Sequence, residues 1–151
     1  MRVIVYTDGG ASGNPGPGGL GAVLIAGPHR REISRGFRLT TNNRMELLAV
    51  ILALEALKHE GTEVEIHSDS KYVVDAVEKR WVFGWEKKHY KDKKNPDLWQ
   101  RFLRVYRRHK VRLVWVKGHA GNPLNEYVDR LAVGAYQHGK LEVDEGYEAG
   151  I

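Results

Sequence analysis

Three strand-like segments follow one another near the start of the chain, with only turns between them. Residues 3–7 are β-branched or aromatic and end at Asp8-Gly9-Gly10, which predicts a strand that runs into a glycine-rich turn. Residues 20–26 and 31–38 read as two further strands, joined at Gly27-Pro28. Because connections this short leave no room for a crossover, we expect neighbouring strands to be antiparallel. The chain is therefore predicted to open with a β-meander.

The remainder of the chain alternates between helical and strand-like patterns. Residues 43–59 are apolar on nearly every face, which predicts a buried helix, and residues 64–67 predict a fourth strand. The further elements that the pattern predicts are a helix from Ser70 whose apolar stripe continues to Trp81, a helix from Pro96, a fifth strand at 111–116 and a helix at 125–138. This order predicts an α/β domain with a five-stranded mixed sheet, an antiparallel meander followed by parallel strands, flanked by helices.

Length and composition predict a single domain. A chain of 151 residues with 42% hydrophobic residues supports one well-packed core. We expect this domain to span residues 1–139 and residues 140–151, with four acids and two glycines, to form a frayed, flexible acidic tail. There is no cysteine, which excludes disulfides and thiolate metal ligands. No apolar run reaches the ~18 residues of a membrane span, so we expect a cytoplasmic monomer without membrane contact.

The basic residues are concentrated in one stretch. The chain has 24 Lys and Arg against 19 Asp and Glu, a net charge of +5 and a pI of about 9.5. Residues 79–112 contain 13 basic and three acidic residues, so this stretch carries +10 and the rest of the chain carries −5. Such a local excess predicts a docking surface for a polyanion.

Four acids are placed where separate elements could bring them together: Asp8, Glu46, Asp69 and Asp129. Taken singly, they also fit a turn residue, a capping box, a helix N-cap and a solvent-facing side chain. However, Asp8 and Asp69 both follow apolar strands, and Glu46 lies in the first turn of a buried helix. Converging carboxylates repel one another unless a cation neutralises them. Oxygen ligands without cysteine favour a hard ion such as Mg²⁺ or Mn²⁺.

Five local strings, in this order, resemble bacterial-type ribonuclease H1. They are Thr7-Asp8-Gly9-Gly10 with the glycine-rich run 13–19, Thr40-Thr41-Asn42-Asn43-Arg44-Met45-Glu46, Ser68-Asp69-Ser70, Trp115-Val116-Lys117-Gly118-His119-Ala120-Gly121, and Asn125-Glu126 with Asp129. The resemblance implies a ribonuclease H-like fold and an endonuclease that hydrolyses the RNA strand of RNA/DNA hybrids. It also implies two Mg²⁺ ions, with Mn²⁺ as a substitute, and products with 5′-phosphate and 3′-hydroxyl ends.

The same resemblance implies roles for the acids and one histidine. Asp8 would bridge two ions, Asp129 would help to hold the ion that presents the attacking water, and Glu46 and Asp69 would hold the other. His119 resembles the family histidine that moves protons or assists product release. An exposed loop histidine is the alternative interpretation of His119.

Further residues resemble the family's substrate contacts. Asn14, Asn42 and Asn43 resemble amides that contact the minor groove of a hybrid, and Thr41 resembles part of a pocket for a phosphate of the DNA strand; a helix-capping run is the alternative. Residues 81–95 resemble a basic protrusion that grips the DNA strand, through Trp81, Trp85, Lys87, Lys88 and Lys91. A solvated charge run, with Trp81 in the core, is the alternative. Lys71 stands where many relatives carry an amide, so its contact with substrate is open.

Some features of the sequence also fit other functions. Gly16-x-Gly18-x-x-Gly21 matches a dinucleotide-binding fingerprint as a string, but Val23-Leu24-Ile25 continues as a strand rather than a helix, so no nucleotide cofactor is expected. A nuclease of another substrate class, such as a resolvase or integrase, would share the fold and the metal. A nucleic-acid-binding module without catalysis is the third possibility.

Overall fold

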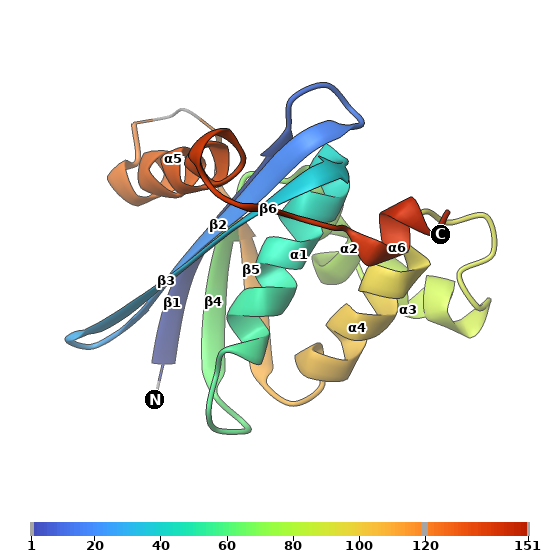
Figure 1. The fold of residues 1–151 in the computed structure, drawn as a ribbon. Helices are drawn as coiled ribbons and strands as arrows, with labels where there is room; N and C mark the ends of the chain where they lie inside the picture. Colours follow the sequence, from blue (N-terminus) through green and yellow to red (C-terminus); the bar gives the residue numbers. More distant parts are fainter. Residues whose placement is uncertain (1, 119–120, 151) are drawn as a thin grey trace.

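The computed structural model describes residues 2–118 and 121–150, which fold around a six-stranded sheet (Figure 1). The sheet order is β5-β4-β1-β2-β3-β6. Its strands are β1 (Arg2–Ala11), β2 (Gly16–Ala26), β3 (His29–Thr40), β4 (Glu63–Ser68), β5 (Lys110–Trp115) and β6 (Leu141–Glu142). β1, β2 and β3 form the antiparallel meander, and β4 and β5 add in parallel beside β1. The predicted mixed α/β sheet is confirmed.

Helices cover both faces of the sheet, in the arrangement that Figure 1 shows. They are α1 (Asn42–Glu55), α2 (Lys71–Glu78), α3 (Trp81–Lys87), α4 (Pro96–Tyr106), α5 (Pro123–His138) and α6 (Glu145–Glu148). α5 lies on one face, and α1 lies on the opposite face with α2, α3 and α4 around it. Among the described residues, no helix combines the length and the apolar character that a membrane crossing requires.

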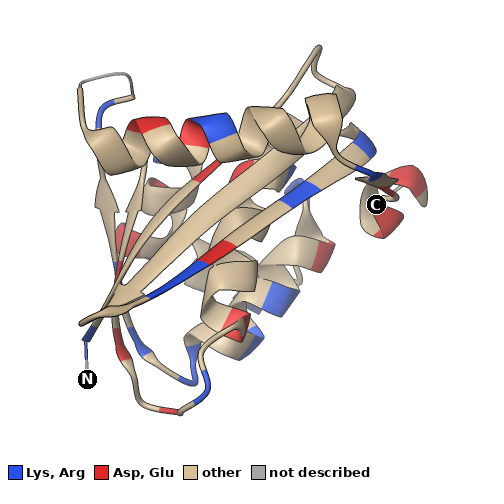
Figure 2. Cartoon of the chain, turned by 60° about the vertical axis from the view of Figure 1, so that its left-hand side comes forward, with Lys and Arg blue, Asp and Glu red and all other residues tan. Residues whose placement is uncertain are grey.

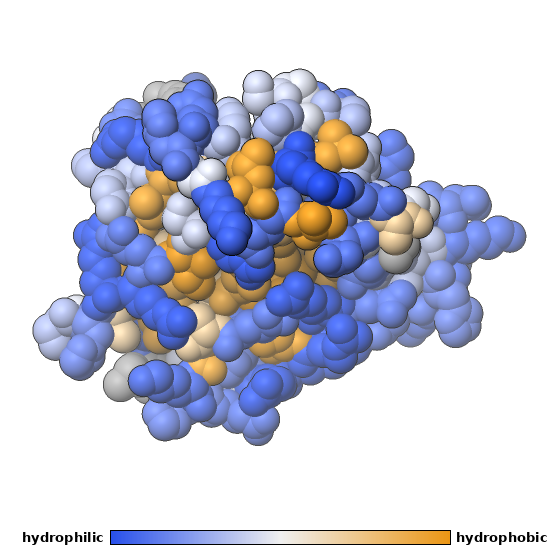
Figure 3. All heavy atoms as spheres, in the orientation of Figure 1, coloured by the Kyte–Doolittle hydropathy of each residue, from blue (hydrophilic) through white to orange (hydrophobic). Residues whose placement is uncertain are grey.

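α1 is the centre of the core. Its residues are buried on almost all sides, because the sheet lies against one side and α2 and α4 pack against the others. On the molecular face shown in Figure 3, hydrophobic atoms are visible only as patches between hydrophilic side chains. The nearly continuous apolar sequence of this helix therefore reflects burial from several directions, as predicted. The helix ends at Glu55 rather than at the predicted residue 59.

α5 packs so closely on the meander that the strands carry glycines along the contact. A Cβ atom on Gly19 would lie 2.2 Å from the carbonyl oxygen of Ala132, and one on Gly36 would lie 2.3 Å from that of Ala135. Because neither distance is compatible with a side chain, glycine is required at these positions. This close packing sets the height of α5 above the sheet and with it the position of Asp129.

The end of the chain differs from the expected frayed tail. β6 adds a sixth strand parallel to β3, and α6 follows it. Figure 2 shows acidic residues, coloured red, in this helix near the C-terminus. Arg35 and Arg38 of β3 form ion pairs with Glu142 and Glu148. Basic residues on β3 therefore pair with C-terminal acids that were expected to be solvated.

The segment after α2 also differs from the prediction. The helix ends at Glu78, and Arg80, with a left-handed φ of 65°, turns the chain before α3 begins. Trp81 therefore does not continue the apolar stripe of α2, and it is 48% exposed. Residues 85–95 are highly charged, but two of them, Tyr90 and Asn95, are buried. Gly84 lies inside α3 rather than at a helix end.

Candidate metal centre and nucleic-acid surface

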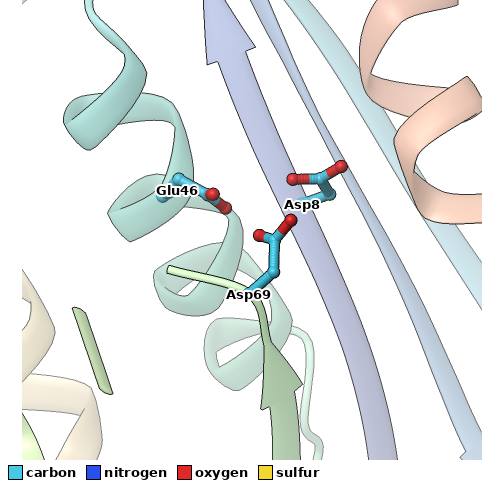
Figure 4. A group of neighbouring side chains, drawn as sticks. All are labelled: Asp8, Glu46 and Asp69. Carbon is cyan, nitrogen blue, oxygen red and sulfur yellow. The ribbon is translucent and has the colours of Figure 1, made fainter. Parts of the chain in front are cut away.

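Three carboxylates from separate elements meet at one edge of the sheet. Asp8 lies in β1, Glu46 lies in α1, and Asp69 directly follows β4. The parallel register of β1 and β4 pairs Tyr6 with His67, so two residues further on Asp8 and Asp69 come level. One carboxylate oxygen from each acid lies within 4.8 Å of the other two. Figure 4 shows the three side chains directed toward one another; we call them the three-acid cluster.

Gly9 allows Glu46 to reach this cluster. A Cβ atom at Gly9 would lie 2.4 Å from the carbonyl carbon of Met45 and 2.6 Å from the backbone nitrogen of Glu46. No side chain fits in that space, so glycine lets the first turns of α1 lie directly on β1. The prediction that the first strand ends at Asp8-Gly9-Gly10 was wrong, because β1 continues to Ala11. The role of Gly9 is to let two carboxylates from different elements come together.

The capping groups of both helices leave the acids free. Thr41 is the N-cap of α1, and its hydroxyl accepts a hydrogen bond from the backbone N–H of Arg44, whereas a capping box with Glu46 would need Asn43 as the N-cap. Glu46 is therefore not part of a capping box. Ser70 caps α2 in the same way, so Asp69 is not the N-cap residue. Other residues therefore perform the capping roles that were the alternative interpretations of Glu46 and Asp69.

The three-acid cluster is electrostatically unfavourable as it stands. Burial, the negative charge of Asp69 and the neighbouring Asp129 together raise the pKa of Asp8 to about 8, although the backbone N–H of Gly9 opposes this. Burial, followed by the charges of Asp8 and Asp69, raises the pKa of Glu46 well above its usual value. Both shifts indicate that negative charge here lacks a neutralising partner.

The donor set fits a hard divalent cation. Among the described residues, one buried carboxylate oxygen of Glu46 and one of Asp69 have no hydrogen-bond partner. Buried polar atoms are nearly always paired, so two unpaired oxygens beside each other indicate a ligand site. All of the donors are carboxylate oxygens, which is the donor type that Mg²⁺ and Mn²⁺ prefer.

The fourth predicted acid, Asp129, approaches the cluster from the other face of the sheet. It is half-buried in α5, and it contributes to the raised pKa of Asp8. It is not among the three acids whose oxygens lie within 4.8 Å of one another. His119 lies outside the described residues. Gly118, just before it, lies beside Asp69, because a Cβ atom there would be 3.0 Å from the Asp69 carboxylate.

The predicted amides join the glycine-rich loop to the start of α1. The side-chain oxygen of Asn42 accepts a hydrogen bond of 2.6 Å from the backbone N–H of Ala11. The side-chain oxygen of Asn14 accepts one of 3.1 Å from the backbone N–H of Asn42. Both asparagines are exposed, so their NH₂ groups remain available as donors. Asn43 is also exposed, whereas Thr41 is half-buried because it caps the helix.

Lys71 and Trp115 form a pair beside Asp69. The indole N–H of Trp115 donates a 3.2 Å hydrogen bond to the backbone carbonyl of Asp69. The Lys71 ammonium lies 4.8 Å from the centre of the Trp115 ring, a cation–π arrangement. Trp115 is 43% exposed, so this pair faces solvent at the rim of the three-acid cluster.

The RNase H family model matches residues 1–137 of this chain. The chain belongs to the ribonuclease H family. Membership implies dependence on a divalent metal ion, for which the three-acid cluster is the candidate site.

Named relatives agree with this assignment. A Ribonuclease H of Rippkaea orientalis is 52% identical over 97% of this chain and 93% of its own length. A Ribonuclease HI of a Synechocystis species is 49% identical over 96% and 94% of the two chains. Among solved structures, LC9-RNase H1 superposes with a TM-score of 0.80 at 34% identity, covering 99% of this chain and 81% of its own. LC11-RNase H1, solved in complex with an RNA/DNA hybrid, gives 0.65 at 28% identity over 89% and 96%.

In this ribonuclease H, residues 81–95 project a group of cations. Lys87, Lys88 and Lys91 are all exposed at the end of α3 and just beyond it. Trp85 is half-buried and packs edge-on against Trp99, with ring centres 5.7 Å apart. The tryptophans therefore divide between two roles: Trp85 anchors the segment to the core, and the exposed Trp81 faces outward. We keep the name basic protrusion for residues 81–95.

Sequence reasoning missed a buried ionic network next to the cluster. Arg44, two residues before Glu46, is 1% exposed and forms ion pairs of 2.7 Å with Asp97 and 2.8 Å with Asp144. Thr40 donates a hydrogen bond of 2.7 Å to Asp144. An arginine inside an otherwise apolar helix was the available signal, because a buried guanidinium needs acids around it. We call these four residues the Arg44 network.

Proposed function

We propose that this chain is an endonuclease that hydrolyses the RNA strand of RNA/DNA hybrids and leaves 5′-phosphate and 3′-hydroxyl ends. The observation that carries the proposal is the three-acid cluster, with buried and unpaired carboxylate oxygens, in a chain of the ribonuclease H family. The solved complex of LC11-RNase H1 with an RNA/DNA hybrid supports the same substrate class. We assign this activity to one catalytic domain, expected from sequence to span residues 1–139 and extended by β6 and α6, acting as a monomer.

In this proposal Asp8, Glu46, Asp69 and Asp129 are the ligands of two Mg²⁺ ions, for which Mn²⁺ substitutes. When bound, such ions activate a water molecule and stabilise the leaving oxygen of an in-line displacement. The raised pKa values of Asp8 and Glu46 support the assignment, because carboxylates that repel one another favour a cation. His119 is proposed as an auxiliary that moves protons or assists product release.

Hybrid selectivity is assigned to groups on the two sides of the three-acid cluster. The free NH₂ groups of Asn14, Asn42 and Asn43 suit the minor groove, where 2′-hydroxyls accept hydrogen bonds. Thr41 and the basic protrusion suit the phosphates of the DNA strand, with Lys87, Lys88 and Lys91 supplying charge and Trp81 and Trp85 supplying aromatic surface. Lys71, held over Trp115, suits a phosphate rather than a base edge.

No nucleotide cofactor enters this proposal. The three glycines that match the dinucleotide fingerprint, Gly16, Gly18 and Gly21, lie inside β2. They are not at a turn between a strand and a helix, which is where a pyrophosphate would meet backbone N–H groups. Their role in this structure is to permit close packing, since a Cβ atom on Gly21 would lie 2.7 Å from that of Leu131.

The test is a cleavage assay with four labelled substrates: RNA/DNA hybrid, double-stranded RNA, double-stranded DNA and branched DNA, each with Mg²⁺ or EDTA. We expect cleavage of the hybrid alone, on its RNA strand, and only with Mg²⁺. Asp69→Asn is expected to lower kcat by at least ~100-fold, the scale of losing one preorganised charged group from an active site.

Asp75→Asn is the matched control, because Asp75 is a half-buried acid of the neighbouring α2 that pairs with Lys79. It should cleave the hybrid at the wild-type rate. Cleavage of either DNA substrate, or hybrid cleavage that persists in EDTA, would contradict the proposal. Binding of the hybrid without any cleavage would instead indicate a non-catalytic module.

A further inference from the structure

A hollow of about 500 Å³ lies beside the start of α1, and the C-terminal end of the chain forms part of its wall. Its lining residues include Asn14, Thr41, Asn43, Lys93, Lys94 and Tyr147 of α6. Two lysines and several residues with hydrogen-bond donors around one hollow suit a phosphodiester. Tyr147 is thus brought from the far end of the sequence to residues that we have proposed as substrate contacts.

The C-terminal segment, residues 141–148, is held in this place by specific contacts. Asp144 is buried and accepts two hydrogen bonds from the Arg44 guanidinium, of 2.8 and 2.9 Å. It also caps α6, because its carboxylate accepts a hydrogen bond from the backbone N–H of Tyr147. One carboxylate therefore fixes both the start of α6 and the buried guanidinium of α1.

The C-terminal segment packs tightly against the Arg44 network. A Cβ atom on Gly146 would lie 1.9 Å from the Asp97 carboxylate and 2.8 Å from the Arg44 guanidinium. The backbone next to Tyr147 therefore lies directly against the Arg44 network, and no larger residue fits there. A segment seated in this way presents its tyrosine in a defined position instead of sampling many.

We propose that the C-terminal segment is part of the nucleic-acid-binding surface, with the Tyr147 hydroxyl donating a hydrogen bond to a backbone phosphate held in this hollow. The inference rests on the proposed function, because it assumes that a hybrid occupies the surface around Asn14 and Thr41. It goes beyond the family match, which ends at residue 137. The substrate surface then includes residues that were expected to form a flexible tail.

The test measures binding of a fluorescent RNA/DNA hybrid in EDTA, where no cleavage occurs, at several salt concentrations. Tyr147→Phe keeps the ring and removes the hydroxyl, and we expect it to raise Kd by about threefold to tenfold, the range for one hydrogen bond. The loss should be the same at every salt concentration, because no charge is removed. Lys93→Gln, in contrast, should reduce the salt slope.

Val143→Ala is the matched control, since Val143 is exposed in the same segment and lines a different hollow. It should bind as the wild type does. Thermal unfolding of each variant verifies that binding is measured on folded protein. Wild-type affinity for both Tyr147→Phe and Tyr147→Ala would overturn the inference, and so would weakening by Tyr147→Ala alone. If wild type itself neither binds nor cleaves the hybrid, the proposed function fails instead.

Discussion

At the scale of single residues, the three-acid cluster is arranged against the stability of the metal-free protein. Asp8 is buried, its carboxylate faces Asp69 and Asp129, and its pKa is raised to about 8. Like charges brought together without a counter-ion raise the free energy of the folded state. The residues assigned to catalysis therefore weaken the fold that holds them, which gives a test that is independent of activity.

Asp8→Asn is expected to increase the free energy of unfolding in EDTA at neutral pH by about 2 kcal/mol, while abolishing hybrid cleavage. Asparagine keeps an oxygen that accepts the hydrogen bond from the Gly9 N–H, and it has no ionisation for burial and the neighbouring acids to oppose. Urea denaturation followed by circular dichroism measures the change.

Asp75→Asn is again the control, because Asp75 faces Lys79 at 3.7 Å rather than other acids. It should alter stability by less than about 0.5 kcal/mol. Saturating Mg²⁺ should shrink the advantage of Asp8→Asn, since a bound cation removes the repulsion in wild type. Equal stability of Asp8→Asn and wild type in EDTA would mean that the cluster is not electrostatically strained.

Residue identity and local order were enough to single out Asp8, Glu46 and Asp69, because Asp8 and Asp69 follow apolar strands and Glu46 lies near the start of a buried helix. Arg44 could not be assigned in the same way. Its partners, Asp97 and Asp144, are separated from it by 53 and 100 residues. The role of a buried arginine can be assigned only when the acids around it are known, and tertiary packing decides which acids those are.

At the scale of elements, the basic protrusion is a short helix and loop fixed at one point and charged elsewhere. Trp85 packs against Trp99, and Lys93 lies 5.1 Å from the Trp85 ring centre. Several residues after α3 have left-handed φ angles, among them His89, Tyr90 and Asp92. Such angles are uncommon outside glycine, so composition could not predict this path. The charge of the element was predicted and its conformation was not.

Replacing Lys87, Lys88 and Lys91 together by glutamine is expected to weaken hybrid binding and to reduce the slope of log Kd against log salt by about 2 to 3. The three ammonium groups are exposed, so their loss should leave thermal stability nearly unchanged. Fluorescence anisotropy in EDTA at several salt concentrations measures the slope.

The control triple replaces Arg31, Lys58 and Lys110 by glutamine and removes the same charge. Arg31 and Lys58 border one hollow and Lys110 another, both away from the residues that line the Tyr147 hollow. A similar loss of slope in both triples would show that net charge alone attracts the hybrid. An unchanged slope in the protrusion triple would show that its lysines are ordinary solvated charge.

At the scale of the whole molecule, the sequence predicted the long elements of the fold but not the two short elements at its C-terminal end. The meander, α1 and the parallel strands follow from local periodicity, and they position the three-acid cluster. β6 has two residues and α6 has four, which is too short for any periodic signal. Their place depends on ion pairs with β3 and on the Arg44 network, so only the folded chain shows that residues 141–148 close the structure.

The Arg44 network makes global stability depend on acid pH. Burial opposes ionisation of Asp144, but hydrogen bonds from Arg44 and Thr40 outweigh it and lower the pKa of this carboxyl below its usual value. A carboxyl with a lowered pKa in the folded protein contributes stability that is present above its unfolded pKa, about 3.9. That contribution is lost as the pH falls through the folded pKa.

Asp144→Asn is therefore expected to lower the free energy of unfolding at pH 7 by about 3 kcal/mol, the cost of removing one partner from a buried ion pair. The free energy of unfolding of Asp144→Asn should also fall less steeply than that of wild type between about pH 5 and pH 2.5, because the titrating carboxyl is gone. Glu148→Gln, which breaks the exposed pair with Arg38, should cost under about 1 kcal/mol. Denaturant unfolding across this pH range measures all three proteins. Parallel pH profiles for wild type and Asp144→Asn would show that the C-terminal segment does not couple to the core through this carboxylate, and would remove the structural basis for placing Tyr147 at the substrate.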